Sequence, residues 1–403
     1  MMTLSGVYPP SSSVEDGRLE IAGCDAVELA REFGTPAYVV AEDDLRARAR
    51  VFAGASDARI VYASKAFPCT AALRVFAEEG LAVDVASGGE LHLALRAGFD
   101  PADIVLHGNA KSHAELAAAV EAGVGLIVLD GSDAAKLSDL GVTGQRCLVR
   151  VVPGVDVDTH TGIQTGGTTS KFGLLPGEAA ALIADPPASV DVVGLHFHLG
   201  SQLFDTAPFT AAIEALRALG EFEVYDLGGG LGVGYTRADE PPAAEDWVRD
   251  VVGVARDVLG DDCELMLEPG RALVANAGVT LYTVQDVKRS FVAVDGGMSD
   301  NLRPMLYEAR YEAVLADRVE TPGDPYDVVG KHCESTDVLV RAAELAAPRA
   351  GDVLVTPATG AYGHAMANNY NGIPRPPVVV CADGDARVVV RRETYEDLTA
   401  RDA

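Results

Sequence analysis

The sequence of 403 residues is poor in lysine, in paired cysteines and in long hydrophobic runs. Only six of its 32 basic residues are lysine, 60 residues are acidic, and the formal net charge is -28. This acidic excess, without a basic stripe, argues against nucleic acids and anionic membrane surfaces as partners. A hydrophobic fraction of 48% with 23% charged residues predicts a globular protein with one large and one smaller domain.

Hydrophobic runs and cysteines set further limits on the class of protein. No apolar run reaches the roughly 18 to 20 residues that span a bilayer. Residues 1–10 lack the basic and apolar regions of a secretory signal. The six cysteines stand far apart, with no C-x-x-C pair, which disfavours a zinc site or a disulfide framework. These features predict a reduced, cytoplasmic setting.

Eight apolar, β-branched runs alternate with stretches rich in alanine, leucine and glutamate. Strands that alternate with helices pair in parallel through right-handed crossovers. We therefore predict an α/β fold, a (β/α)8 TIM barrel over residues 31–277, with a doubly wound sheet as the alternative. Ser87-x-x-Glu90 and Ser112-x-x-Glu115 predict helix starts, and Gly98 and Gly123 predict helix ends. The eight runs are residues 60–65, 81–86, 104–107, 126–130, 148–153, 192–198, 224–228 and 265–268.

The pattern changes after about residue 278, where strand-like runs follow one another with little helix between them. They cover 279–284, 291–295, 327–330, 353–357 and 378–390, with a hairpin turn at 382–385. We predict a mainly antiparallel β-domain over residues 278–403, joined by the N-terminal segment 1–30. The short run 38–40 is left outside the eight barrel strands. A Gly- and Thr-rich segment, 159–171, is interpreted as a mobile flap or a plain loop.

Chemically unusual residues close several predicted barrel strands, where a barrel has its active face. Lys65 ends the first strand and either forms a salt bridge, for example to Asp84, or acts as a Schiff-base nucleophile. The glycines at 228–230 follow the seventh strand, as a tight turn or an anion cradle. Glu268 and Arg271 follow the eighth, where the arginine suits a phosphate or carboxylate and a surface ion pair is the alternative.

Two histidines, His196 and His198, close the sixth strand, and Ser201 follows them. Strand alternation places both imidazoles on one side. They could ligate a metal, as in barrel hydrolases with an H-x-H pair, but the later strand ends carry glycines and a glutamate instead of further ligands. A role for His198 in stacking on an aromatic cofactor, with Ser201 near a phosphate, fits better. His196 is interpreted as a core histidine.

The predicted β-domain carries three short polar clusters. Cys333-Glu334-Ser335-x-Asp337 holds either a buried free thiol or a thiol acid with a tuned pKa. The segment around Tyr362 is either an ordinary turn or part of a site. Arg303-x-x-x-Tyr307 supplies a guanidinium and a phenol that could grip a carboxylate.

Together and in this order, these motifs resemble the alanine-racemase-like, fold-type III pyridoxal-phosphate decarboxylases, and among them the diaminopimelate decarboxylase family. The resemblance runs from about residue 16 to 397, nearly the whole chain. Its barrel motifs are Tyr62-Ala-Ser-Lys-Ala66, Asp84-Val-Ala-Ser-Gly-Gly-Glu90, His107-Gly-Asn-Ala-Lys-Ser112, Ser170-Lys-Phe-Gly173, His196 to Ser201, the triple glycine, and Glu268 to Arg271. Its later motifs are Asp295-Gly-Gly-Met298, His332-Cys-Glu-Ser335, and Gly360-Ala-Tyr362 followed by Asn369-Tyr-Asn371.

The resemblance implies a role for each matching residue. Lys65, His198 and Cys333 would be catalytic: Lys65 would hold pyridoxal 5'-phosphate covalently, His198 would stack on its ring, and Cys333 would donate a proton. Glu268 would pair with the ring nitrogen. Further cofactor-binding residues would be Asp84, Ser201, Gly228, Gly229, Gly230, Gly270, Arg271 and Tyr362. The substrate-binding residues would be Arg271, Arg303, Tyr307, Glu334 and Tyr362, and no metal is implied.

The activity implied by the resemblance is decarboxylation of meso-2,6-diaminopimelate to L-lysine and CO2, the last step of lysine biosynthesis. The enzyme would be a homodimer with shared active sites, in which the Cys333-Glu334 segment comes from the partner subunit. The alternatives are a relative acting on ornithine, arginine or a carrier-bound glutamyl group, a metal-dependent barrel hydrolase, and a non-catalytic cofactor-binding barrel. Arg303 and Tyr307 argue against a substrate that lacks a distal carboxylate.

Overall fold

The computed structural model describes residues 4, 6–155 and 170–403, and these form two compact units. A β-unit comprises Met1–Ala47, Val233–Glu240 and Leu273–Ala403, and a barrel unit comprises Arg48–Gly232 and Pro241–Ala272. The units are thus not contiguous in sequence, unlike the predicted segments 31–277 and 278–403. One reason is local: Asn276 Nδ2 donates to the carbonyl of Gly234 at 2.9 Å, which ties residues 233–240 to the β-unit.

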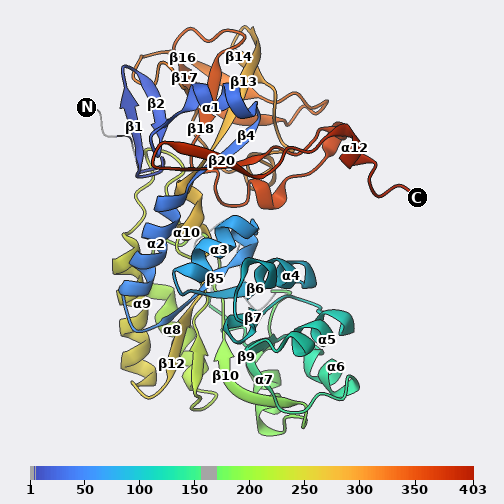
Figure 1. The fold of residues 1–403 in the computed structure, drawn as a ribbon. Coiled ribbons are helices and arrows are strands. Elements are labelled where there is room, and N and C mark those ends of the chain that lie inside the picture. Colours follow the sequence, from blue (N-terminus) through green and yellow to red (C-terminus); the bar gives the residue numbers. More distant parts are fainter. Residues whose placement is uncertain (1–3, 5, 156–169) are drawn as a thin grey trace. The chain divides into compact units, whose positions relative to one another are not determined.

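The barrel unit contains a closed sheet of eight parallel strands, which confirms the predicted barrel (Figure 1). The sheet closes where Met266 of the last strand pairs with Arg59 of the first. Apolar side chains such as Val61, Val128 and Leu148 form its core. The strands are β5 (Arg59–Ala63), β6 (Ala82–Val85), β7 (Ile104–Leu106), β8 (Leu126–Leu129), β9 (Gln145–Arg150), β10 (Val190–His196), β11 (Val224–Asp226) and β12 (Glu264–Leu267).

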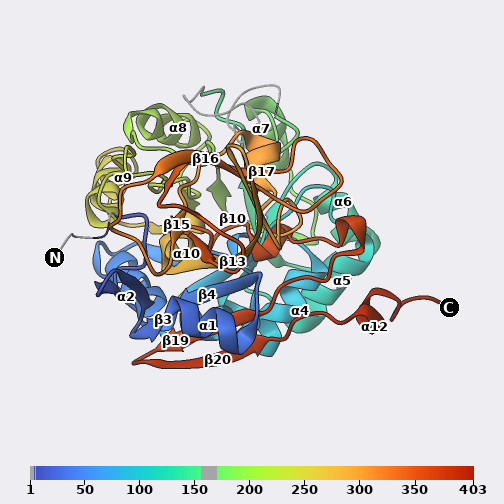
Figure 2. The same ribbon diagram turned by 90° about the horizontal axis from the view of Figure 1, so that it is seen from above.

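Helices connect these strands and lie around the barrel, as the view from above shows for α4 to α9 (Figure 2). Ser112 and Glu115 form the predicted capping box at the start of α5, and Gly98 and Gly123 end α4 and α5 in the left-handed conformation that glycine adopts without strain. The helices are α3 (Thr70–Glu78), α4 (Gly88–Ala97), α5 (His113–Ala122), α6 (Asp133–Asp139), α7 (Pro176–Ala184), α8 (Ala207–Arg217), α9 (Ala244–Leu259) and the short α10 (Arg271–Val274), and α2 (Glu42–Gly54) precedes β5.

The β-unit is built on a nine-stranded, mainly antiparallel sheet, as predicted. Its main path runs β17, β16, β14, β13, β4, β19, β20, and β18 pairs with β13 and β15. Only the β4–β19 and β14–β16 pairs are parallel. The strands are β4 (Ala37–Ala41), β13 (Gly278–Lys288), β14 (Phe291–Val294), β15 (Val314–Leu315), β16 (Asp324–Val329), β17 (Val338–Leu345), β18 (Val353–Thr356), β19 (Val378–Ala382) and β20 (Asp385–Val390).

The N-terminal residues pack into the same unit. Strands β1 (Ser12–Glu15), β2 (Arg18–Ile21) and β3 (Cys24–Asp25) form a small separate sheet. Leu19 and Ile21 share a core with Leu281 and Val379 of the large sheet. The unit also holds the short helices α1 (Ala26–Phe33), α11 (Arg303–Tyr307) and α12 (Tyr395–Leu398).

Two further predictions from the sequence concern the segment 159–171 and the lack of a membrane-spanning run. The predicted flap, 159–171, lies outside the described residues except for Ser170 and Lys171. Among the helices that the structure describes, none has both the length and the apolar character required to cross a bilayer.

Candidate active site

The turn that carries Lys65 is fixed by a carboxylate from α4. Residues 64–66 form a short 3-10 turn directly after β5. Glu90 Oε2 accepts hydrogen bonds from Ser64 Oγ at 2.9 Å and from the backbone N–H of Ala86 at 2.7 Å. The Glu90 side chain is therefore used to hold this turn and not to complete the predicted capping box, of which only the bond from the Glu90 N–H to Ser87 Oγ is formed.

Lys65 itself extends from this turn with its side chain 47% exposed, and its Nζ lies 4.0 Å from Oδ2 of Asp84. That separation is at the outer limit of an ion pair, so a salt bridge explains little of the lysine's placement. Asp84 is buried, and burial raises its pKa to about 6. A partly exposed amine beside a weakly acidic carboxyl suits a nucleophile better than a structural cation.

Glu268 lies just after β12 and belongs to a cluster of four buried side chains. His107 Nε2 lies 2.5 Å from Glu268 Oε1, and His196 Nε2 lies 3.3 Å from Oε2. Neither atom of the His107 contact has a hydrogen-bond partner among the described residues, and the two atoms lie within the distance of an ion pair. With Asp226, the possible ligand atoms of this cluster lie within 4.8 Å of one another. His196 is buried, as expected of a core histidine, and it lies beside Glu268.

The protonation states in this cluster follow from burial and charge. Burial opposes ionisation of Glu268, but the neighbouring His107 and His196 outweigh it and hold the pKa of Glu268 well below its usual value. Burial, with the charge of Glu268, raises the pKa of Asp226 well above its usual value. Burial lowers the pKa of His196 to about 3. The cluster therefore favours the ionised form of Glu268 and the protonated form of Asp226.

The glycine turn after β11 packs so closely that no side chain could replace its hydrogens. A Cβ on Gly229 would lie 2.0 Å from the carbonyl oxygen of Glu268, and one on Gly228 would lie 2.4 Å from that of Phe197. The N–H of Gly229 donates to Nδ1 of His198 at 3.2 Å. Burial and the Lys65 charge hold the pKa of His198 well below its usual value, so it is a neutral ring that accepts at Nδ1.

A cation and a hydroxyl are paired at the ends of two other barrel strands. Arg271 is buried, and its Nη2 and Nε donate to Ser201 Oγ at 2.9 and 3.3 Å. A Cβ on Gly270 would lie 3.0 Å from that of Ala63, so the segment leading to Arg271 runs directly against the β5 end. Hydroxyl, guanidinium and backbone N–H groups are the donors that bind a phosphate.

Arg150 is a site residue that the sequence-based interpretation missed. It ends β9, and its guanidinium lies 4.5 Å from the ring centre of Phe172. Burial lowers its pKa, and the nearby carboxylates of Asp130 and Glu268 act in the opposite direction. The signal was present, because Arg150 lies in a predicted strand run that ends on the same face as Lys65 and Glu268.

In the β-unit, Arg303 and Tyr307 are the first and last residues of α11. Arg303 is buried, its guanidinium lies 4.3 Å from the ring centre of Tyr235, and its Nη1 donates to the hydroxyl of Tyr311. Burial opposes the charge, but Tyr235 and Tyr311 outweigh it and raise the pKa. Arg303 is therefore a preorganised cation. Tyr235 lies far from Arg303 in sequence, so no local pattern could reveal this contact.

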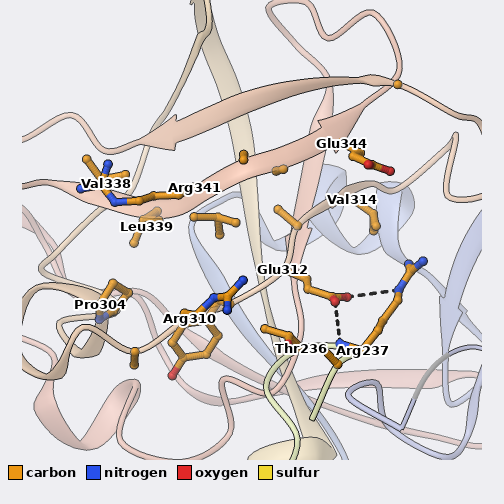
Figure 3. Close-up of a pocket in the computed structure, with 18 of the residues that line it drawn as sticks. Thr236, Arg237, Pro304, Arg310, Glu312, Val314, Val338, Leu339, Arg341 and Glu344 are labelled. Atoms are coloured by element: carbon orange, nitrogen blue, oxygen red, sulfur yellow. Dashed lines mark hydrogen bonds and ion pairs between the residues drawn. The ribbon is translucent and has the colours of Figure 1, made fainter.

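Cys333 lies in the loop of residues 330–337 between β16 and β17. Of the six cysteines, all within the described residues, it alone is exposed, and Glu334 beside it is half-buried. A groove of about 1190 Å³ begins at Ser335 in the same loop and continues along β17. Figure 3 shows the ion pair of Arg237 and Glu312 in the lining of this groove, with Arg237 Nε 3.2 Å from Glu312 Oε2.

The predicted site residues thus fall into two groups, one in each unit. The barrel unit brings together most of the predicted cofactor-binding residues. In the β-unit, Tyr362 is half-buried with a left-handed φ of 59° and contributes to the electrostatic environment of Arg303. The first group is Lys65, Asp84, His198, Ser201, Gly228, Gly229, Gly230, Glu268, Gly270 and Arg271, and the second is Arg303, Tyr307, Cys333, Glu334 and Tyr362.

Comparisons with known proteins identify the family of this chain. Residues 42–275 match the family model described as pyridoxal-dependent decarboxylase, pyridoxal binding domain. The chain is 44% identical to a diaminopimelate decarboxylase of Bacillus subtilis, over 98% of each chain. It is 45% identical to one of Actinosynnema pretiosum, over 99% of this chain and 95% of the relative.

Solved structures give the same result. A diaminopimelate decarboxylase from M. jannaschii superimposes with a TM-score of 0.91 at 34% identity, covering 98% of each chain. One from Helicobacter pylori, complexed with L-lysine, superimposes with a TM-score of 0.85 at 33% identity over 93% of this chain and 98% of that one. The chain therefore belongs to the diaminopimelate decarboxylase family of pyridoxal-dependent decarboxylases.

Proposed function

We propose that this protein decarboxylates meso-2,6-diaminopimelate to L-lysine and CO2, the last step of lysine biosynthesis, as a pyridoxal-phosphate-dependent carboxy-lyase. The observation that carries the proposal is the buried Glu268 carboxylate, held ionised between His107 and His196. A carboxylate in this position keeps a pyridine nitrogen protonated and the ring strongly electron-withdrawing. The relatives named diaminopimelate decarboxylase support the choice of substrate.

The residues of the barrel unit fit pyridoxal phosphate. The glycine turn, which a Cβ would fill, offers backbone N–H groups, and Ser201 with Arg271 adds a hydroxyl and a cation for the phosphate. Lys65 would supply the amine that holds the cofactor, and the neutral ring of His198 would pack against the cofactor ring. When bound, the cofactor delocalises the negative charge that remains on the substrate carbon after CO2 leaves.

We assign the remaining residues to the substrate. The Arg303 guanidinium, fixed by Tyr235 and Tyr311, binds the distal carboxylate, because a planar cation pairs with a carboxylate in two-point contact. Tyr307, Tyr362 and Arg271 add polar contacts, and Asp84 orients Lys65. Glu334 binds the distal ammonium group of the substrate.

Cys333 donates the proton that replaces the lost carboxyl group. Loss of CO2 breaks the bond from the α-carbon to its carboxyl group, and the electron pair left behind must take up a proton before the product amine can leave. The Cys333 thiol is exposed and supplies that proton to the α-carbon, becoming a thiolate that solvent protonates again.

The active form is a homodimer with shared active sites, in which Cys333 and Glu334 of one protomer act at the site of its partner. The exposure of Cys333, and the groove that begins beside it at Ser335, support this assembly. Six free thiols favour a reducing, cytoplasmic location.

Release of CO2 from different amino acids tests the substrate. We expect meso-diaminopimelate to be turned over at least about 100-fold faster than ornithine or arginine, because only it has a distal carboxylate for Arg303. Equal turnover of ornithine would favour the related decarboxylases. A colourless protein with stoichiometric zinc would favour a metal-dependent hydrolase using His107, His196, Asp226 and Glu268, whose ligand atoms lie within 4.8 Å of one another.

A further inference from the structure

The loop that carries Cys333 is held by a buried aspartate. The Asp337 side chain is 2% exposed and accepts three hydrogen bonds: Oδ1 from the N–H of Met298 at 2.7 Å, and Oδ2 from the N–H and the Nδ1 of His332 at 3.0 and 2.7 Å. The backbone closes tightly around this carboxyl group, because a Cβ on Gly330 would lie 2.1 Å from Oδ2. Asp337 therefore joins both ends of the loop to the segment before α11.

The imidazole of His332 is held by the Asp337 carboxylate and also by an aromatic ring. Its side chain is fully buried, and its ring stacks on that of Tyr370, with the centroids 5.8 Å apart and the planes 7° from parallel. The Nε2 atom has no hydrogen-bond partner among the residues that the structure describes. The carboxylate and the stacked ring thus hold the imidazole, which makes no other polar contact in the described chain.

The next residue in the chain is held as well. The N–H of Cys333 donates to Oδ1 of Asn371 at 2.8 Å, and Asn371 follows Tyr370 directly. His332 and Cys333 are therefore attached through adjacent residues to the same segment, and the thiol is the exposed end of an otherwise anchored stretch. An eight-residue loop between two strands would ordinarily move on its own.

We propose that His332, oriented by Asp337, is a positioning residue that fixes the Cys333 thiol and the Glu334 carboxylate for the reaction. This inference rests on the proposed function for its catalytic consequence, but the anchoring itself does not depend on it. A proton donor must be held within hydrogen-bond distance of the carbon it serves, and a displacement of about 1 Å costs on the order of 10²-fold in rate.

Two variants separate the hydrogen bond of His332 from its bulk. His332→Asn keeps a donor near the position of Nδ1, and His332→Leu keeps the volume without the donor. Lys331→Ala is the matched control, because Lys331 is exposed and precedes His332 in the chain, and its backbone N–H bond to the Gly296 carbonyl remains.

Hydrogen exchange measures the anchoring without substrate or cofactor turnover. In the unmodified protein we expect the amides of His332 and Cys333 to be protected, and in His332→Leu to exchange at least about 100-fold faster. His332→Asn and Lys331→Ala should keep the protection. Unchanged exchange in a folded His332→Leu protein would overturn the proposal, whatever the substrate proves to be.

Kinetics measures the catalytic consequence. We expect His332→Leu to lower kcat by about tenfold or more and to raise KM for meso-diaminopimelate by a smaller factor, because Glu334 is displaced together with Cys333. His332→Asn should restore most of kcat. A rise in KM alone, or equal damage by both variants, would contradict a positioning role. Inactivity of the unmodified protein on every amino acid would refute the proposed function and leave the exchange result to decide the anchoring.

Discussion

The Nε2 atom of His107 lies 2.5 Å from Oε1 of Glu268 in the interior of the barrel unit. Together with His196 on the other carboxylate oxygen, this contact keeps a fully buried carboxyl group ionised. An isolated carboxylate would not stay charged at such a depth. Glu268 can therefore present a negative charge to a cofactor ring without exposure to solvent.

Replacing the Glu268 carboxylate with a neutral amide should slow the reaction without loss of the bound cofactor. We expect Glu268→Gln to lower kcat by roughly 10² to 10³-fold, because the ring nitrogen loses the partner that keeps it protonated. Cofactor absorbance should persist. Glu264→Gln, at the exposed start of the same strand, is the control and should leave turnover unchanged. Full activity of Glu268→Gln would remove this residue from the mechanism.

Lys65 should be required for covalent attachment of the cofactor. We expect an absorbance band at about 420 nm that borohydride shifts and that Lys65→Ala abolishes, because this amine forms the bond. Lys288→Ala is the comparison, since the Lys288 side chain is 73% exposed and paired only locally with Asp286. A band that survives in purified Lys65→Ala would point to another amine.

Arg303 should govern the affinity for the substrate and not for the cofactor. Arg303→Lys retains the charge but loses the planar fork, and we expect KM for meso-diaminopimelate to rise about tenfold, or ~1.4 kcal/mol. Spectroscopic titration with pyridoxal phosphate should be unaffected. Arg349→Lys, which alters an arginine whose side chain is 76% exposed, should have no effect. An unchanged KM would exclude Arg303 from carboxylate binding.

Mixing two inactive variants tests the shared active site. If Lys65 acts with Cys333 of the partner subunit, heterodimers of Lys65→Ala and Cys333→Ala contain one site with both residues intact. After unfolding and refolding of an equal mixture, we expect about a quarter of the unmodified activity, because half of the dimers are mixed and half of their sites are complete. No recovery in a mixture that forms dimers would place Lys65 and Cys333 in the same protomer's site.

The stability of the protein should fall as the pH rises through the range in which Asp300 titrates. Burial raises the pKa of Asp300 to about 7 in the folded state, from its ordinary value of 3.8. Between these values the folded state binds more protons than the unfolded one, so the contribution is present at low pH and is lost towards pH 7. The slope is at most about 1.4 kcal/mol per pH unit.

Chemical denaturation between pH 4 and pH 8 measures this slope, and Asp300→Asn identifies its origin. The amide resembles the protonated carboxyl in shape and can still accept the hydrogen bond from Gly297 N–H at 2.9 Å. We expect the variant to lose this part of the slope while retaining its fold. An identical slope in both proteins would assign the pH dependence to other groups.

The barrel and much of the site could be predicted because their signals are local. Each strand run ends beside its own helix start, so Lys65 and Glu268 could be placed on one face from sequence order alone. Strand β17 (Val338–Leu345) was missed, because alanine, glutamate and leucine are good helix formers and its strand conformation depends on pairing with β16. The contacts of Arg303 with Tyr235, and of Asp337 with Met298, join distant parts of the chain that no periodic pattern connects.

Strand β4 sets an order of events during synthesis of the chain. It lies near the N-terminus, yet its Tyr38 pairs with Val378 of β19 and with Thr280 of β13. Every residue of the barrel unit leaves the ribosome between β4 and those two partners. Strand β4 therefore has no partner in the large β-sheet until β13 has been made, and it lacks its second partner until β19 follows. A nascent chain halted shortly before β19 would have a finished set of barrel strands and an unfinished sheet.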